Sequence, residues 1–121
     1  MNFSAVMPQP TISVYQPHKV SPRGNLYKIP ITHASEDGKT THNFEIWATK
    51  EAVQQHFQNN LTTEEPKSYE LKKFARQMYE KQLRSNNGQL QHKGMLVTTD
   101  NVTHGNPNLW PSALNHPEIK I

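Results

Sequence analysis

The clearest pattern along the chain is two stretches in which apolar and polar residues alternate, residues 25–33 and 40–48. An Asp-Gly pair at 37–38 lies between them, and this dipeptide between alternating stretches is typical of a β-hairpin turn. Pairing the two stretches around the dipeptide sets Ile31 opposite Phe44. A shift by one residue would set the apolar side chains opposite polar ones, so the pattern predicts one register and one apolar face.

Pro30 refines the turn of this hairpin. Proline has no N–H to donate, so it fits poorly in a hydrogen-bonded pair of the ladder. A four-residue loop over 36–39 keeps the same partners but turns Pro30 away from the hydrogen bonds of the hairpin. We therefore expect the first strand to be an edge strand near Pro30, or to be bulged there.

Beyond the hairpin, a three-and-four spacing of apolar residues predicts an amphipathic helix over 64–84. Thr63 is suited to cap its first turn, and the Asn-Asn-Gly run at 86–88 is suited to end it. Thr49 is suited to cap a shorter helix over 50–59. The apolar positions of the long helix are Leu71, Phe74, Ala75, Met78, Tyr79 and Leu83.

The two ends of the chain carry weaker patterns. Residues 1–24 hold four of the nine prolines, which favours an extended, partly ordered arm. Within it, residues 11–15 alternate and are suited to an added edge strand. Residues 95–99 predict one more strand, and residues 100–121 predict an irregular segment.

Together these elements predict an α+β fold with a single domain, which suits a length of 121 residues. A small antiparallel sheet is built on the β-hairpin of residues 25–48. The helices over 64–84 and 50–59 pack on one face of that sheet. The predicted core spans residues 25–99.

The chain contains no cysteine, which excludes disulfides, thiol catalysis and cysteine-based zinc sites. Its first ten residues lack the basic start and apolar stretch of a secretory signal, and no apolar run approaches the roughly 20 residues of a membrane-spanning helix. We expect a cytoplasmic protein with no membrane partner, although delivery by a signal-less secretion route stays open. Lysine outnumbers arginine and asparagine is abundant, which is typical of an AT-rich genome and favours a bacterial or phage source.

The chain has seven histidines, and histidine is a common metal ligand, so metal binding is a candidate function. The hairpin register sets His33 opposite His42, but a zinc site needs three or four ligands and no HExxH motif is present. The two aspartates have structural explanations, since Asp37 suits the turn and Asp100 suits the end of a strand. We expect no metal site, no cofactor and no catalytic activity.

The outer face of the hairpin predicts a different kind of site. If Phe44 faces the long helix, then Trp47 faces away from it, together with Leu26 and Lys28. An exposed apolar patch of this kind is typical of an interaction surface, and tryptophan is enriched at such sites. The alternative is that the N-terminal arm, the strand over 95–99 or the segment around Trp110 covers Trp47.

The most economical function is therefore a non-catalytic protein-binding module, an adaptor or inhibitor of another protein that can also form a homodimer through Trp47. The alternative function is a nucleic-acid-binding accessory protein. Its surface would be the basic side of the long helix, Lys72, Lys73, Arg76 and Arg84. The net charge of +3 is mild, and four glutamates share that helix, so a solvated charged face explains the same residues.

Overall fold

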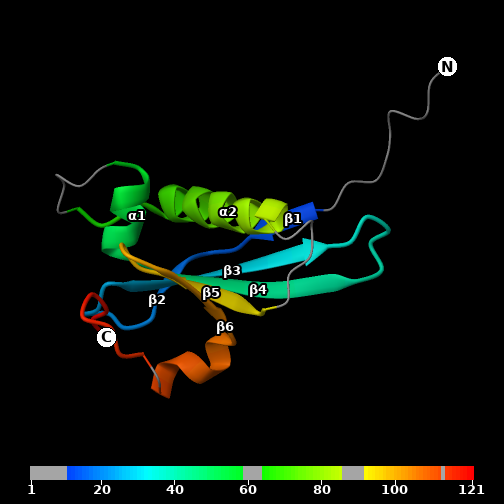
Figure 1. The fold of residues 1–121 in the computed structure, drawn as a ribbon. Coiled ribbons are helices and arrows are strands. Elements are labelled where there is room, and N and C mark those ends of the chain that lie inside the picture. The colour runs from blue at the N-terminus through cyan, green and yellow to red at the C-terminus, as the bar shows by residue number, and fades with distance from the viewer. Residues whose placement is uncertain (1–10, 59–63, 86–91, 113) are drawn as a thin grey trace.

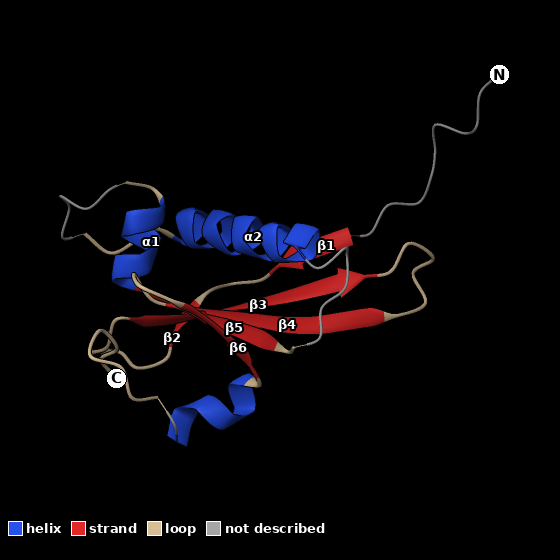
Figure 2. Cartoon of the chain, in the orientation of Figure 1, coloured by secondary structure: helices blue, strands red, loops and turns tan. Residues whose placement is uncertain are grey.

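The computed structural model describes residues 11–58, 64–85, 92–112 and 114–121. These residues form an α+β fold built on a mixed sheet of six strands. Two α-helices lie along one face of the sheet, and the C-terminal part of the chain lies along the other (Figures 1 and 2).

The strands are β1 (Thr11–Val14), β2 (His18–Lys19), β3 (Leu26–Ala34), β4 (Thr41–Thr49), β5 (Gly94–Val97) and β6 (Val102–Gly105). Their order across the sheet is β1-β3-β4-β5-β6, and β2 also pairs with β3. The expectation of a purely antiparallel sheet is wrong at one pair, because β4 and β5 run parallel. Both helices lie in the connection between β4 and β5. A helical crossover connection of this kind returns the chain to the starting end of the sheet, so the next strand runs parallel to the previous one.

The hairpin of β3 and β4 has the predicted register, with Ile31 opposite Phe44. Its loop also has the predicted four residues, since the Ser35 N–H donates to the Thr40 carbonyl at 2.9 Å. At the other end of the hairpin, the backbone of residue 50 donates to that of residue 25 at 2.8 Å. Hydrogen-bonded pairs alternate along an antiparallel ladder, so odd-numbered residues of β3 bond to even-numbered residues of β4.

The expectation that β3 is an edge strand near Pro30 is wrong, because β1 and β2 pair with its outer side. The added chain is nevertheless interrupted between Val14 and His18, at the level of Pro30. Tyr15 donates its N–H to the Pro30 carbonyl at 2.9 Å, and Pro30 has no N–H to return. The missing donor thus coincides with the break between β1 and β2.

The long helix α2 (Ser68–Ser85) begins four residues later than expected. The Glu70 carboxylate accepts the backbone N–H of Lys67 at 3.0 Å, which is the reciprocal half of a capping box and fixes the start there. Residue 64 is therefore outside the helix. The proposed cap at Thr63 and the proposed stop at 86–88 lie outside the described residues.

The short helix α1 (Lys50–His56) begins where the sequence predicts, because the Thr49 hydroxyl accepts the Ala52 N–H at 3.1 Å. It ends three residues before the expected end at residue 59. Gln58 has a positive φ of 55°, a left-handed conformation that stops a helix.

One large core lies between the helices and the sheet. Helix α2 contributes Leu71, Phe74, Ala75 and Tyr79 to it. The sheet contributes Tyr27, Ile29, Ile31, Phe44, Ile46, Ala48, Met95 and Val97. The apolar face predicted for the hairpin is therefore the face that α2 covers.

The end of the chain is more ordered than expected. Residues 102–105 form β6, and residues 107–112 form the short 3-10 helix η1 (Pro107–Ser112). Residues 107–112 and 114–121 then lie against the second face of the sheet (Figure 1). We call these two stretches the C-terminal cover.

Candidate functional site

The C-terminal cover buries the surface that the sequence predicts as an interface. Leu26 and Trp47 are only 0% and 4% exposed. The Trp110 ring packs edge to face on the Trp47 ring, with 5.3 Å between the ring centroids. The partly buried residues packed around them are Val20, Leu96, Leu114 and Ile119. The expectation of an exposed patch is therefore wrong, and the alternative that the segment around Trp110 covers Trp47 is correct.

Lys28 is the one member of the predicted interface that reaches solvent, with 42% of its side chain exposed. Its ammonium lies 5.9 Å from the centroid of the Trp47 ring and 3.6 Å from the Glu45 carboxylate. The same carboxylate accepts the indole N–H of Trp47 at 3.1 Å. At the margin of the buried cluster, the Glu45 carboxylate thus bonds to both Lys28 and Trp47.

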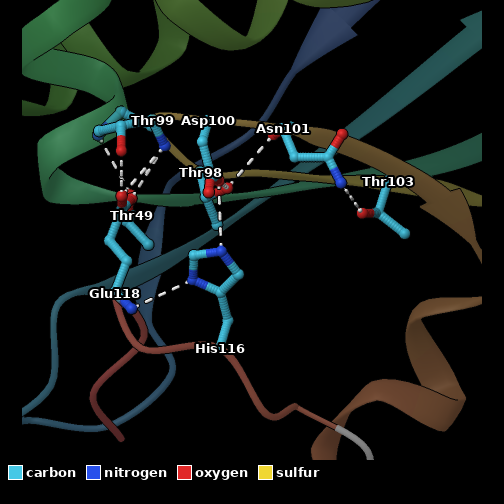
Figure 3. Close-up of polar contacts among 9 residues, drawn as sticks. Thr49, Thr98, Thr99, Asp100, Asn101, Thr103, His116 and Glu118 are labelled. Carbon is cyan, nitrogen blue, oxygen red and sulfur yellow. Dashed lines mark hydrogen bonds and ion pairs between the residues drawn. The ribbon is translucent and has the colours of Figure 1, made fainter.

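Glu118 fastens the C-terminal cover to the sheet (Figure 3). Its carboxylate accepts hydrogen bonds from the hydroxyls of Thr49 and Thr99, and from the Thr99 N–H at 3.1 Å. Asn25 adds a second fastening, since its amide donates to the Glu118 carbonyl and its side-chain oxygen accepts the Lys120 N–H at 2.8 Å. Both sets of contacts hold the cover rather than leaving polar groups free for a ligand.

Beside Glu118, the His116 ring donates a hydrogen bond from Nε2 to the Asp100 carboxylate, with 3.2 Å between Nε2 and Oδ1 (Figure 3). The Thr98 hydroxyl donates to the same carboxylate, and this hydrogen bond is the main cause of the lowered pKa of Asp100. The other ring nitrogen of His116 accepts the Glu118 N–H at 3.1 Å. Both ring nitrogens of His116 are therefore hydrogen-bonded within the molecule.

The part of the second face that the cover leaves open forms a groove of about 490 Å³. It lies over the outer half of β3 and β4 and is lined by Pro30, Ile31, Thr32, Thr41, His42, Asn43, Phe44, Glu45, Lys93, Asn106, Pro107 and Asn108. A Cβ on Gly94 would lie 2.4 Å from the ring of Pro107, so the glycine lets the start of η1 close one wall. Below, "the groove" means this site.

The chemistry of the groove is hydrogen bonding. Threonine and asparagine side chains dominate its polar lining, and its carboxylate, Glu45, already bonds to Lys28 and Trp47. His42 pairs with His33 on the helix-covered face, so its ring points away from the groove floor. Among the described lining residues, no nucleophile stands beside a free base.

The two hairpin histidines are partly buried beside the core under α2, where His33 contacts Tyr79 and His42 contacts Phe44. His33 shares a 2.9 Å hydrogen bond with the Tyr79 hydroxyl, and burial raises the pKa of Tyr79 to about 12. Burial, and then the charge of His42, lower the pKa of His33. Nε2 of His42 is buried, and no described residue bonds to it. Within the described residues, no group of three or more His, Cys, Asp or Glu side chains is arranged to hold a metal ion.

The basic side of α2 is partly engaged within the molecule. Arg76 donates to the Ile12 carbonyl of β1 at 2.8 Å, and the Lys73 ammonium lies 5.8 Å from the Phe57 ring centroid. Lys72 is half-buried and Arg84 is exposed. Tyr69, which the sequence did not single out, is 66% exposed one turn before Lys72 and Lys73.

No family model, no curated protein and no solved structure matches this chain. In the part of the chain that the structure describes, no helix combines the length and the apolar character needed to cross a membrane.

Proposed function

We propose that the protein is a non-catalytic protein-binding module, an adaptor or inhibitor of another protein, and that the groove holds the partner. The observation that carries this proposal is an open groove of about 490 Å³ lined by hydrogen-bonding side chains. The engagement of Glu45 by Lys28 and Trp47 leaves the lining without a free carboxylate base. Such a lining supports recognition rather than chemistry.

The polarity of the groove suits a partner that associates and dissociates. Interfaces between proteins that also exist apart are about as polar as the rest of a protein surface, and they rely on hydrogen bonds for their specificity. A homodimer through Leu26 and Trp47 would require the C-terminal cover to leave, so it forms no part of the proposal.

Site-directed photo-cross-linking tests this proposal in a lysate of the source cells. A photoreactive phenylalanine analogue replaces Asn108 in the groove wall, and in a second variant it replaces Gln55 on α1, which is exposed outside the groove. We expect one protein to cross-link at position 108 and not at position 55. The purified partner should then bind the wild-type chain in isothermal titration calorimetry. Identical adducts from both positions, or none, would contradict the proposal.

The alternative function, nucleic-acid binding, is favoured by one observation. The exposed ring of Tyr69 lies on the same helix face as Lys72, Lys73 and Arg76, and single-stranded nucleic acids bind where an aromatic ring accompanies basic residues. Arg76 and Lys73 have contacts within the molecule, which weakens the case for this surface.

A fluorescent single-stranded oligonucleotide tests the alternative. If α2 binds nucleic acid, the affinity will fall steeply with salt and will be lost in Lys72→Glu/Lys73→Glu. Lys39→Glu/Lys120→Glu, at two exposed positions outside α2, is the matched control because it changes the net charge by the same amount. We expect the α2 variant and the control variant to have the same affinity for the oligonucleotide.

A further inference from the structure

Among the described residues, strand β4 has one edge that is paired along only half of its length. Strand β5 begins at Gly94, opposite Glu45, so it pairs with β4 from Glu45 to Ala48 alone. The first four residues of β4, 41–44, pair with β3 on one side and with no described strand on the other. This stretch of β4 is below called the open edge.

The hydrogen-bond pattern of the hairpin identifies which backbone groups the open edge presents. Even-numbered residues of β4 bond to β3, so odd-numbered residues point their N–H and C=O groups outward. Glu45 shows this direction, because its N–H donates to the Lys93 carbonyl at 3.0 Å. Thr41 and Asn43 point the same way, are exposed, and make no backbone hydrogen bond to another described residue on that side.

The open edge and the groove meet. Side chains of Thr41 and Asn43 line the groove, and Lys93 lines it at the point where β5 begins. The Lys93 side chain is exposed and forms no ion pair with the described residues. The site therefore combines backbone donors and acceptors that no described residue pairs with, polar side-chain pockets, and a cation at one end.

We propose that the open edge binds an extended segment of another protein as an added β-strand, in line with β5. The proposal rests on the proposed protein-binding function and specifies its mode. The segment would pair with the backbone of Thr41 and Asn43, place every second side chain in the groove, and offer an acidic residue to Lys93. Strand addition of this kind takes affinity from main-chain hydrogen bonds and specificity from alternate side chains.

An extended polypeptide is the occupant that these groups fit. Thr41 and Asn43 each present a donor and an acceptor, spaced by two residues along a strand, and another strand carries matching groups at the same spacing. The polar lining favours serine, threonine or asparagine on the inward side of that segment. The charge of Lys93 favours a segment that is acidic at one end.

The experiment uses the full chain and a peptide selected from a phage-displayed library of random peptides of about ten residues, enough for one added strand. Binding of the synthetic peptide is measured by fluorescence anisotropy to wild type, Asn43→Pro and Asn43→Thr. Proline removes the outward N–H of residue 43 without touching the bonds to β3, whereas threonine keeps that N–H. We expect Asn43→Pro to weaken binding by about tenfold or more and Asn43→Thr to change it by less than about threefold.

Amide hydrogen exchange keeps the test independent of any folding defect in Asn43→Pro. In the free wild-type chain, the Asn43 N–H should exchange fast and the Phe44 N–H slowly, and the peptide should protect Asn43. Lys93→Glu should weaken the binding of a peptide that carries the acidic residue. It should leave unchanged the binding of a peptide in which glutamine replaces that residue.

Each remaining outcome overturns the inference. If the photo-cross-linked partner or the peptide binds equally well to Asn43→Pro, with Asn43 still unprotected, the groove binds its partner without strand addition and the protein-binding function survives. If no peptide is selected and no partner cross-links at position 108, both proposals fail. If the open edge instead pairs two copies of this chain, sedimentation will show a dimer that Asn43→Pro dissociates.

Discussion

Trp47 lies between the sheet and the C-terminal cover, and its indole contacts both. Replacing it with alanine leaves a cavity under Trp110 and removes the donor to Glu45. We expect Trp47→Ala to lower the free energy of unfolding by about 3–5 kcal/mol, the range for a large aromatic residue removed from a core. Urea denaturation followed by circular dichroism measures this loss.

Leu109→Ala is the matched control for Trp47→Ala. Leu109 belongs to the same cover, yet 65% of it is exposed, so its loss should change stability by less than about 0.5 kcal/mol. Equal effects of the two substitutions would contradict the burial of Trp47. A stable Trp47→Ala variant would restore the expectation of an exposed indole.

His33 links stability to pH. Its pKa is lowered in the folded chain, so the unfolded chain takes up a proton at a higher pH than the folded chain does. The contribution of His33 to the free energy of unfolding is fully present above its ordinary pKa of 6.5. It is lost as the pH falls through that value toward the lowered pKa of His33 in the folded chain. We expect the Tm to fall between about pH 7.5 and about pH 5.5.

His33→Gln should reduce that fall in Tm, because glutamine can still bond to Tyr79 but does not titrate. His104 has a pKa lowered by burial and then by His92, so part of the pH dependence should remain. His104→Gln should remove that remainder when it is combined with His33→Gln. A pH profile that neither substitution changes would exclude these histidines as its cause.

At the scale of the elements, the two faces of the β3–β4 hairpin should respond differently to substitution. Phe44 is buried under α2 against Tyr79, so Phe44→Ala should cost about 3–5 kcal/mol of stability. Thr32 lies on the other face, where its hydroxyl meets the exposed Tyr15 hydroxyl at 2.9 Å. Thr32→Ala should cost less than about 1 kcal/mol in the same urea titration. Comparable losses would contradict the register.

The elements that sequence predicts well are those whose determinants are local. The turn at 37–38 and the alternation beside it define the β3–β4 register, and the Thr49 cap defines the start of α1. The sequence misplaces the start of α2, because the capping contact that defines this start is made by the Glu70 carboxylate to the Lys67 N–H. Strand β6 was missed because its four residues are too short and too polar to stand out.

The candidate site is the least predictable part, because distant segments assemble it. The hairpin contributes Thr32 and Asn43, but Lys93 and Asn108 come from segments whose position depends on the parallel pairing of β4 with β5. No local sequence pattern predicts the parallel pairing of β4 with β5. The sequence does not predict the burial of Trp47 for the same reason, since Trp110, which covers it, lies more than sixty residues away along the chain.

For the whole molecule, the C-terminal cover should behave as an integral part of the fold. Deleting residues 106–121 uncovers Leu26 and Trp47 and removes the Glu118 carboxylate from Thr49. We expect a lower Tm, a red shift of the fluorescence of Trp47, the tryptophan that remains, and self-association in sedimentation, because a newly exposed apolar face tends to associate. A truncated chain with unchanged Tm and mass would show that the cover adds nothing to the sheet.

The parallel pair of β4 and β5 also has a consequence for the order of folding. The β3–β4 hairpin closes a loop of four residues, whereas β5 must return across both helices, and contacts of large sequence separation form slowly. An early intermediate would therefore hold the hairpin with the whole outer side of β4 unpaired. Unpaired strand edges of this kind favour pairing between chains, so refolding yield should fall as protein concentration rises, even though described strands pair with most of β4 in the finished sheet.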